Sequence, residues 1–145
     1  MALQRITFKK HVNNAVIPTR AGDNEIGYDL TVIEKKNFIN NITVVYDTGI
    51  SVKPPEGYYT EIVPRSSLVK TGWMLANSVG IIDPTYRGTL KIVMIKIYPE
   101  AEDLTLPFVK FQLIVRKTYT PEILVADILD ETERGEGGFG STDES

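Results

Sequence analysis

The sequence predicts an all-β sandwich or barrel built from many short strands. Short runs of β-branched and aromatic residues recur along the chain, and turn residues separate them, many drawn from its 11 glycines and 8 prolines. No stretch shows the long 3.6-residue period of an amphipathic helix. The 145 residues suit one domain with a hydrophobic core, and no internal repeat is visible.

The expected strands follow one another to about residue 130. They are Ile6–Phe8, Tyr28–Ile33, Ile42–Tyr46, Tyr58–Val63, Leu90–Ile97, Phe108–Val115 and Ile123–Leu129. One helical turn is expected at Ser66–Lys70, with Ser66 as its N-cap. The core pattern stops at about Glu131. We therefore expect a β-rich core over residues 1–130 and a flexible arm over 131–145.

Composition excludes several kinds of chemistry. The chain has no cysteine, which excludes disulfides, thiolate zinc sites and cysteine nucleophiles. His11 is the only histidine, so a histidine-rich metal site is excluded and a Ser-His-Asp triad is disfavoured. Acid–base chemistry must therefore fall mainly to carboxylates.

Charge and hydropathy indicate which partners to expect. The net charge of −3 gives no broad attraction to nucleic acid or to anionic membranes. No apolar run approaches the length of a membrane span, and no signal-peptide or other targeting pattern is visible. We expect a cytoplasmic protein, or one in the nucleus or in the cytoplasm of a virus-infected cell, with no nucleic-acid or membrane partner.

The glycine-rich tail Arg134–Thr142 has the residue types that a nucleotide needs. Glycine allows backbone N–H groups to approach phosphate oxygens, while arginine and hydroxyl side chains add donors. The ring of Phe139 could lie on a nucleobase. A disordered glycine-rich end is the alternative. The tail is not a Walker loop, because no lysine follows its last glycine.

Asp83 is the candidate general base. It follows an apolar run and precedes Pro84, which favours an extended backbone at Asp83. Gly80 and Gly88 bracket the segment, as in a hairpin with close backbone approach. A carboxylate held in this way could take a proton from water, although a turn-forming Asp is the alternative. Tyr86 could stack on a sugar ring or simply close the hairpin.

A second group of polar residues suits an anion and a metal ion. Pro64–Leu68 follows a strand and opens the helical turn, so N–H groups and two hydroxyls could bind an anion; a helix cap with a spare serine is the alternative. Asp29 lies among strand residues. It could pair with an arginine such as Arg65, be solvated, or hold a hydrated Mg²⁺.

Two amides complete the candidate residues. Asn77 could read a base edge, although an asparagine in a loop is often a turn former. Gln112 is a polar residue within an apolar strand, so it needs a partner if it is buried, and a backbone partner is the default.

Taken together, these segments resemble the trimeric dUTP pyrophosphatase (dUTPase) family from Ala21 to Thr142. Five blocks fall in the family's order, which is far more specific than any one of them. The fourth is the weakest, because Val109 stands where the family usually has an arginine. The blocks are Gly27–Leu30, Pro64–Leu68, Asn77–Gly88, Gln112–Leu113 and Arg134–Thr142.

The resemblance implies a distorted jelly-roll-like subunit that assembles as a homotrimer. The active sites would lie between subunits, and the arm would close over a neighbour's site. The implied reaction is the Mg²⁺-dependent hydrolysis of dUTP to dUMP and pyrophosphate, which keeps uracil out of DNA and supplies dUMP for dTMP synthesis.

The resemblance also implies roles around the base and the sugar. Asp83 would deprotonate the water that attacks the α-phosphorus, and Tyr86 would pack under the deoxyribose and exclude a 2′-hydroxyl. The side chain of Asn77 would read the uracil edge, together with backbone groups as far as Ile82, including Gly80.

Further roles concern the triphosphate. Ser66 and the N–H of Ser67 would bind phosphate oxygens, and Arg65 would orient nearby acids. Asp29 and Gln112 would hold metal-bound waters.

In the arm, Phe139 would cover the uracil. Arg134, Ser141 and Thr142 would grip the γ-phosphate, with Gly140 among the substrate-binding residues.

Two other functions fit parts of this pattern. A dCTP deaminase-like enzyme shares the fold, but that family uses a glutamate soon after the third block. Here Thr89 and Leu90 follow Gly88, and no glutamate occurs between Gly88 and Glu100. A non-catalytic nucleotide-binding regulatory protein would have no need of Asp83 as a base.

Overall fold

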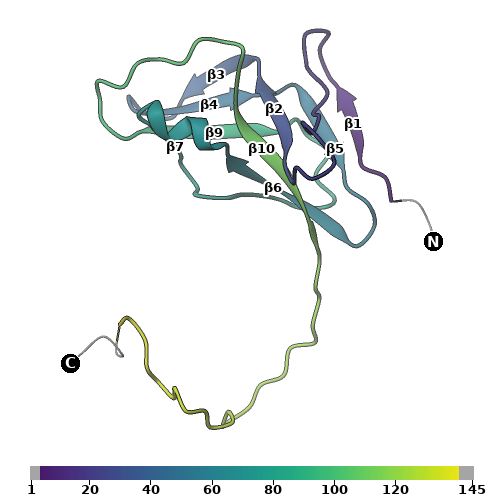
Figure 1. Ribbon diagram of the computed structural model, residues 1–145, viewed down its shortest axis with the longest axis vertical. Helices are drawn as coiled ribbons and strands as arrows, with labels where there is room; N and C mark the ends of the chain where they lie inside the picture. The colour runs from purple at the N-terminus through teal and green to yellow at the C-terminus, as the bar shows by residue number, and fades with distance from the viewer. Residues whose placement is uncertain (1–3, 141–145) are drawn as a thin grey trace.

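The computed structural model describes residues 4–140 of the chain, so the predicted phosphate-binding residues Ser141 and Thr142 lie outside the described residues. Two four-stranded antiparallel sheets and a two-stranded sheet form the body of the protein (Figure 1). The all-β sandwich is therefore confirmed, and its sheets do not close into a barrel. Among the described residues, no helix is long and apolar enough to cross a membrane.

Each sheet joins strands that are distant in sequence. One four-stranded sheet has the order β2 (Tyr28–Val32), β10 (Phe108–Lys117), β6 (Tyr58–Pro64), β8 (Gly80–Ile82). The other has the order β3 (Glu34–Phe38), β4 (Thr43–Asp47), β9 (Lys91–Lys96), β7 (Trp73–Leu75). The small sheet pairs β1 (Thr7–Lys10) with β5 (Ile50–Lys53).

The core lies between the two large sheets. At its centre Tyr46 makes edge contacts with Trp73 and Phe108, at ring-centroid distances of 6.5 and 5.3 Å. The indole Nε1 of Trp73 donates to the carbonyl of Glu102 at 2.9 Å, so this buried polar group is satisfied. Alternate residues of the strands complete the core, among them Leu30, Val32, Val44, Ile62, Ile92, Met94, Phe111 and Leu113.

The helical turn is present as a 3₁₀ helix over Ser66–Lys70, but its predicted cap is wrong. The N-cap residue is Arg65, in an extended conformation, and no side-chain hydrogen bond caps the N-terminus of the helix. Ser66 is the first residue inside the turn. The amide of Leu68 donates to the carbonyl of Arg65 at 3.0 Å, and the hydroxyl of Thr71 donates to the carbonyl of Leu68 at 2.7 Å at the other end of the turn.

The expected strand Ile123–Leu129 is wrong for the single chain. After β10 the chain leaves the sandwich as an extended segment that hangs away from it and leads into the arm (Figure 1). Five large apolar residues of this segment are at least 80% exposed: Ile123, Leu124, Val125, Ile128 and Leu129. The sheets thus end at Lys117, whereas the sequence places the end of the core at residue 130. The boundary at 130 stays a prediction that depends on what covers residues 118–130.

Candidate active site

The register of β10 brings Asp29 and Gln112 together. Gln112 lies opposite Asp29 of β2 on one side and Val63 of β6 on the other. Their neighbours Leu30 and Phe111 are fully buried in the core. Since side chains alternate along a strand, Asp29 and Gln112 share the outer face of this sheet.

Arg65 fixes the carboxylate of Asp29. The Nε of Arg65 lies 3.3 Å from Oδ1 of Asp29, and another guanidinium nitrogen donates to the carbonyl of Val109 at 3.3 Å. Both side chains of the pair are more than a third exposed, so the contact orients the carboxylate more than it stabilises the fold. The pairing of Asp29 with Arg65, one of the alternatives that the sequence offered for this aspartate, is present.

Gln112 is held by backbone, as expected. Its Nε2 donates to the carbonyl of Pro64 at 3.2 Å. Its side chain lies over Gly27, where any Cβ would overlap the Gln112 amide oxygen. The glycine that precedes Tyr28 therefore makes room for the amide beside Asp29.

The two serines of the helical turn differ in exposure. Ser66 is exposed, whereas the hydroxyl of Ser67 is buried and has no hydrogen-bond partner. The first N–H groups of a helix have no partner within it. This turn therefore offers backbone donors and one accessible hydroxyl beside the Asp29–Arg65 pair.

Asp83 lies in a second group, together with Tyr86 and Ile82. These three residues line a shallow hollow of about 210 Å³, with Ile81 and Lys91. The sequence did not predict Lys91 as a site residue. It is the first residue of β9, and the fold places it at the hollow that Asp83 lines.

The hairpin expected between Gly80 and Gly88 is wrong. β8 pairs with β6, whereas β9 pairs with β4 and β7, so residues 83–90 cross from one sheet to the other. The crossing begins with a turn in which the amide of Tyr86 donates to the carbonyl of Asp83 at 3.0 Å. The crossing connection, rather than a hairpin, places Asp83 and Tyr86 side by side.

The ring of Tyr86 is partly exposed and its hydroxyl is anchored. The hydroxyl donates to the carbonyl of Thr89 at 2.8 Å. A Cβ at Gly88 would overlap the Tyr86 hydroxyl, so glycine is needed there. The side chain is 39% exposed, which leaves part of the ring free to contact a ligand.

Asn77 and Gly80 belong to the loop that enters β8. Residues 76–79 are exposed, and Ser78 has a positive φ of 63°. Gly80 is buried against Ile62 of β6, where an added Cβ would lie 3.1 Å from the Ile62 Cβ. The backbone of residues 76–79 is therefore accessible to a ligand, while Gly80 at the end of the loop is held against β6.

One chain does not bring the two groups together. Ile82 of β8 pairs with Thr60 of β6, and Thr60 pairs in turn with Val115 of β10. Val115 is three residues from Gln112, which is about 10 Å along the strand at about 3.3 Å per residue. Asp83 continues in the same direction, away from Gln112. The Asp83 group and the Asp29 group therefore occupy opposite ends of this sheet.

As far as residue 140, the arm makes no hydrogen bond to either group in the single chain. Its hydrogen bonds are internal: Arg134 Nε donates to the carbonyl of Gly137 at 2.6 Å, and Gly135 N to Thr132 Oγ1 at 3.1 Å. Phe139 is fully exposed with a positive φ of 48°, and Gly140 has a φ of 77°. Arg134 and Phe139 thus lie on a segment that extends away from the sandwich.

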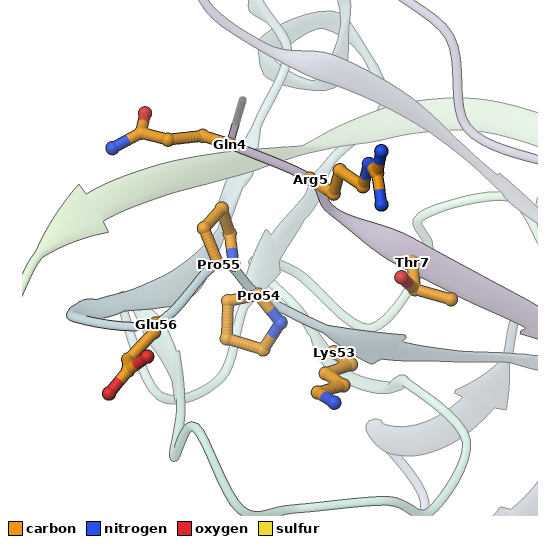
Figure 2. Close-up of a pocket in the computed structure, with 7 residues that line it drawn as sticks. All are labelled: Gln4, Arg5, Thr7, Lys53, Pro54, Pro55 and Glu56. Atoms are coloured by element: carbon orange, nitrogen blue, oxygen red, sulfur yellow. The ribbon is translucent and has the colours of Figure 1, made fainter. Parts of the chain in front are cut away.

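A hollow of about 610 Å³ lies elsewhere, over Gln4, Arg5, Thr7 and the turn from Lys53 to Glu56. Figure 2 shows that its charged side chains, Arg5, Lys53 and Glu56, point away from one another rather than toward one point. No predicted site residue lines it. We therefore do not regard it as the active site, since ligand sites have convergent polar groups.

A charged cluster on the outer sheet face was not predicted. Glu61 of β6 accepts from Arg116 Nε at 2.7 Å and from the Tyr59 hydroxyl at 3.0 Å. Tyr59 also lines a hollow of about 440 Å³ beside Asp83. Tyr59 and Glu61 are neighbours on one face of β6, but Arg116 joins them only through the pairing of β6 with β10, for which local sequence carries no signal.

This cluster predicts a change in titration. The hydrogen bond to Glu61, aided by burial and by the negative charge, raises the pKa of Tyr59. Glu61→Gln should lower that pKa, because the charged acceptor that favours the neutral phenol is lost while Arg116 remains. Difference absorbance between the two proteins in an alkaline titration measures it, and superimposable curves would contradict it.

Comparison with known proteins agrees with this arrangement. A model of the dUTPase family matches residues 13–143. A deoxyuridine 5′-triphosphate nucleotidohydrolase of Yarrowia lipolytica is 41% identical over 132 residues, which cover 89% of this chain and 83% of that protein. One of Paramecium bursaria Chlorella virus 1 is 34% identical over 141 residues, covering 97% of this chain and 99% of that protein.

A solved structure shares the fold. The dUTPase of Staphylococcus bacteriophage 80alpha, a G164S mutant with dUpNHpp, superposes with a TM-score of 0.77 over 95% of this chain and 98% of that one. At 23% identity this likeness supports the fold alone. The family match and the sequence relatives carry the assignment: the chain belongs to the dUTPase family.

Proposed function

We propose that the protein hydrolyses dUTP to dUMP and pyrophosphate. The family match over residues 13–143 carries this proposal. The hollow shared by Asp83, Tyr86 and Ile82 supports it, because it places a carboxylate beside an anchored aromatic ring. A carboxylate that can accept a proton, next to a ring that can pack under a sugar, suits an attack of water on the α-phosphorus of a nucleotide.

Asp83 is the general base in this proposal. Its side chain is exposed at the end of β8, and no hydrogen bond or ion pair to that side chain occurs among residues 4–140. A carboxylate in this state can accept a proton from water as the water attacks the α-phosphorus. Phosphoryl transfer needs alignment and charge neutralisation more than covalent help, so one base is sufficient.

The base and sugar are selected beside Asp83. The open backbone from Asn77 to Ile82 offers donors and acceptors to the uracil edge, where a cytosine amino group would mispair and a thymine methyl would clash. The exposed part of the Tyr86 ring would lie under the deoxyribose. A ribose hydroxyl would crowd that ring.

The triphosphate would bind at the Asp29 group. Ser66 and the N–H of Ser67 donate to phosphate oxygens, and Arg65 holds Asp29 in place. Asp29 and Gln112 fit a hydrated Mg²⁺, because one oriented carboxylate next to one amide suits an ion that keeps most of its waters. Among residues 4–140 no three acidic or histidine side chains gather into a direct metal site, which also favours contact through water. When bound, the ion would neutralise charge on the phosphates.

We also propose that three copies assemble and share their sites. The Asp83 group and the Asp29 group lie at opposite ends of one sheet, so each needs a complement from another chain. The apolar residues 123–129 are exposed in the single chain and need a surface to cover them. The arm of a neighbouring chain would bring Phe139 over the uracil and Arg134 to the γ-phosphate, closing the site to water.

A product assay tests the proposed reaction. Purified protein is incubated with Mg²⁺ and each of dUTP, dCTP, dTTP and UTP, and pyrophosphate and ammonia are measured. We expect pyrophosphate from dUTP, little from the other three, and no ammonia. Release of ammonia from dCTP would instead support a deaminase. If no nucleotide gave a product, the non-catalytic nucleotide-binding protein would be the better assignment.

Gly27→Ala tests the placement of Gln112. The new methyl group must displace the Gln112 amide from Gly27, which breaks its hydrogen bond to Pro64. We expect dUTP turnover to fall about 10-fold, the scale of a misplaced metal-supporting group, with a small change in Tm. Gly22→Ala, where no atom lies within 4 Å, is the matched control and should behave as wild type.

A further inference from the structure

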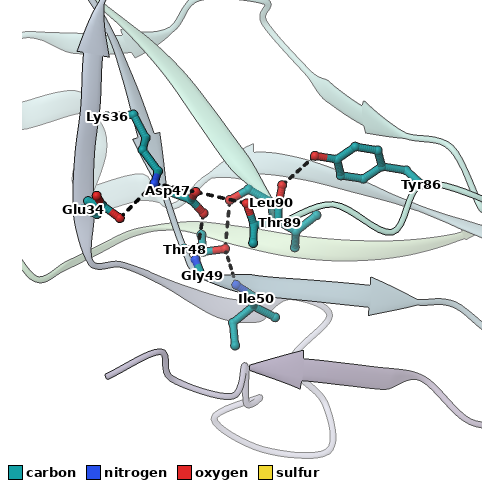
Figure 3. A network of polar contacts seen from close by, with 9 residues as sticks. All are labelled: Glu34, Lys36, Asp47, Thr48, Gly49, Ile50, Tyr86, Thr89 and Leu90. Atoms are coloured by element: carbon teal, nitrogen blue, oxygen red, sulfur yellow. Dashed lines mark hydrogen bonds and ion pairs between the residues drawn. The ribbon is translucent and has the colours of Figure 1, made fainter. Parts of the chain in front are cut away.

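A buried carboxylate next to the active site has no role in the proposed reaction. Asp47, the last residue of β4, is only 5% exposed. Its Oδ1 accepts from the amide of Gly49 at 2.8 Å, and its Oδ2 accepts from the Thr89 hydroxyl at 3.0 Å (Figure 3). The ammonium of Lys36 lies 3.9 Å from Oδ2. Since a buried carboxylate is costly unless it is hydrogen-bonded, these contacts should be well ordered.

Thr89 connects this carboxylate to Tyr86. Its side chain donates to Asp47, while its backbone carbonyl accepts from the Tyr86 hydroxyl at 2.8 Å (Figure 3). The next residue is fixed as well. Leu90 N donates to the carbonyl of Ile50 at 2.7 Å, and the carbonyl of Leu90 accepts from Thr48 Oγ1 at 2.9 Å. The carbonyl that holds the tyrosine is therefore fixed on both sides.

The tyrosine needs this anchor because burial alone does not hold it. The side chain is 39% exposed, and the residues from Asp83 to Arg87 are exposed too. Steric exclusion of a 2′-hydroxyl works only while the ring stays in place. Even a small shift of the ring would weaken this exclusion, since misplacements of about 1 Å change reactivity strongly.

We propose that Asp47 and Thr89 are positioning residues that fix Tyr86 and so sharpen the selection of deoxyribose against ribose. This inference rests on the proposed function, in which Tyr86 packs under the sugar. Neither residue touches the substrate: Asp47 orients Thr89, and Thr89 holds the tyrosine hydroxyl. Loss of either contact should therefore affect UTP and dUTP differently.

The central test is a double-mutant cycle on selectivity. Thr89→Val removes the hydroxyl and keeps the shape, and Tyr86→Phe removes the other end of the connection. The ratio of kcat/KM for dUTP to that for UTP is measured in wild type, both single variants and the double variant. We expect Thr89→Val to lower the ratio about five- to tenfold, the scale of one lost hydrogen bond. The double variant should be no less selective than Tyr86→Phe alone. An unchanged ratio in Thr89→Val, or additive losses, would overturn the proposal.

Three further variants separate positioning from general destabilisation. Asp47→Asn should lower the ratio as Thr89→Val does. Lys36→Gln, which leaves both hydrogen bonds of Asp47, should keep it. Val32→Ala truncates a buried residue of β2, so it should lower Tm but not the ratio. If Val32→Ala changes the ratio as much as Thr89→Val, the positioning role is wrong.

A readout without turnover keeps this test independent of the reaction. In protein with ¹³C-labelled tyrosine, the Tyr86 ring signal is assigned as the one that Tyr86→Phe removes. Thr89→Val should shift or broaden that signal, and an identical spectrum would contradict the inference. If wild type releases no pyrophosphate from dUTP, the proposed function fails, while the ring signal still decides whether Thr89 fixes Tyr86.

Discussion

Asp83→Asn is expected to lower kcat for dUTP about 10²- to 10⁴-fold, the contribution of a positioned general base. The amide has nearly the same shape as the carboxylate but cannot accept the proton of the attacking water. KM should stay close to the wild-type value, because Asp83 is assigned to the water rather than to binding. Steady-state kinetics with a pyrophosphate-coupled assay measures both constants.

Binding measurements distinguish the loss of a catalytic base from a loss of substrate binding. Calorimetry with the non-hydrolysable analogue dUpNHpp should give similar affinities for wild type and Asp83→Asn. Asp23→Asn, which changes an exposed acid outside both groups in the same way, is the matched control and should keep full turnover. Undiminished turnover in Asp83→Asn would remove this residue from the mechanism.

Truncation before Arg134 is expected to lower kcat/KM by at least the order of 10²-fold, as when a preorganised donor to the developing charge is removed. The truncated protein should fold normally. Among residues 4–140, no hydrogen bond joins residues 134–140 to the sandwich, so their removal leaves the core intact. Kinetics and thermal melts on the same preparation measure the two effects separately.

The ring of Phe139 provides the finer test of the arm. Phe139→Ala should raise KM, since stacking of a base on an aromatic ring is worth about 1–3 kcal/mol. Phe139→Trp keeps an aromatic face and should restore most of the loss. Wild-type kinetics in the truncated protein would contradict a role for the arm.

The sequence predicted the central strands but missed four others. Runs such as Ile42–Tyr46 carry β-branched and aromatic residues whose alternate members form the core. β3, β7 and β8 are edge strands, and β5 lies in the small sheet. The sequence of β3 is Glu-Lys-Lys-Asn-Phe, and most of its residues are exposed. It forms a strand because it pairs with β4, not because its composition favours one.

The strand expected at Ile123–Leu129 shows the opposite case. Its residues favour a strand, but among residues 4–140 it pairs with no other strand. A strand needs a neighbour for its backbone hydrogen bonds as well as suitable side chains. Composition alone therefore could not decide whether the segment is a strand.

The candidate site was predicted where its signals were local. The blocks around Asp29, Arg65, Asp83 and Gln112 lie in short segments, and the pairing of Asp29 with Arg65 followed from residue chemistry. The contacts of Glu61 with Arg116 and of Asp47 with Thr89 join residues far apart in the sequence. They depend on strand register and on the crossing between the sheets, which a single sequence does not show.

The central claim is that each active site combines residues of different chains, and mixing two inactive variants tests it most directly. Asp83→Asn and the protein truncated before Arg134 are unfolded together in equal amounts and refolded, and each is also refolded alone. If the base and the arm come from different subunits of a trimer, random assembly should restore about a quarter of wild-type turnover. If the mixture, sedimenting as a trimer, is no more active than its two components, each site lies within one chain and the account is wrong.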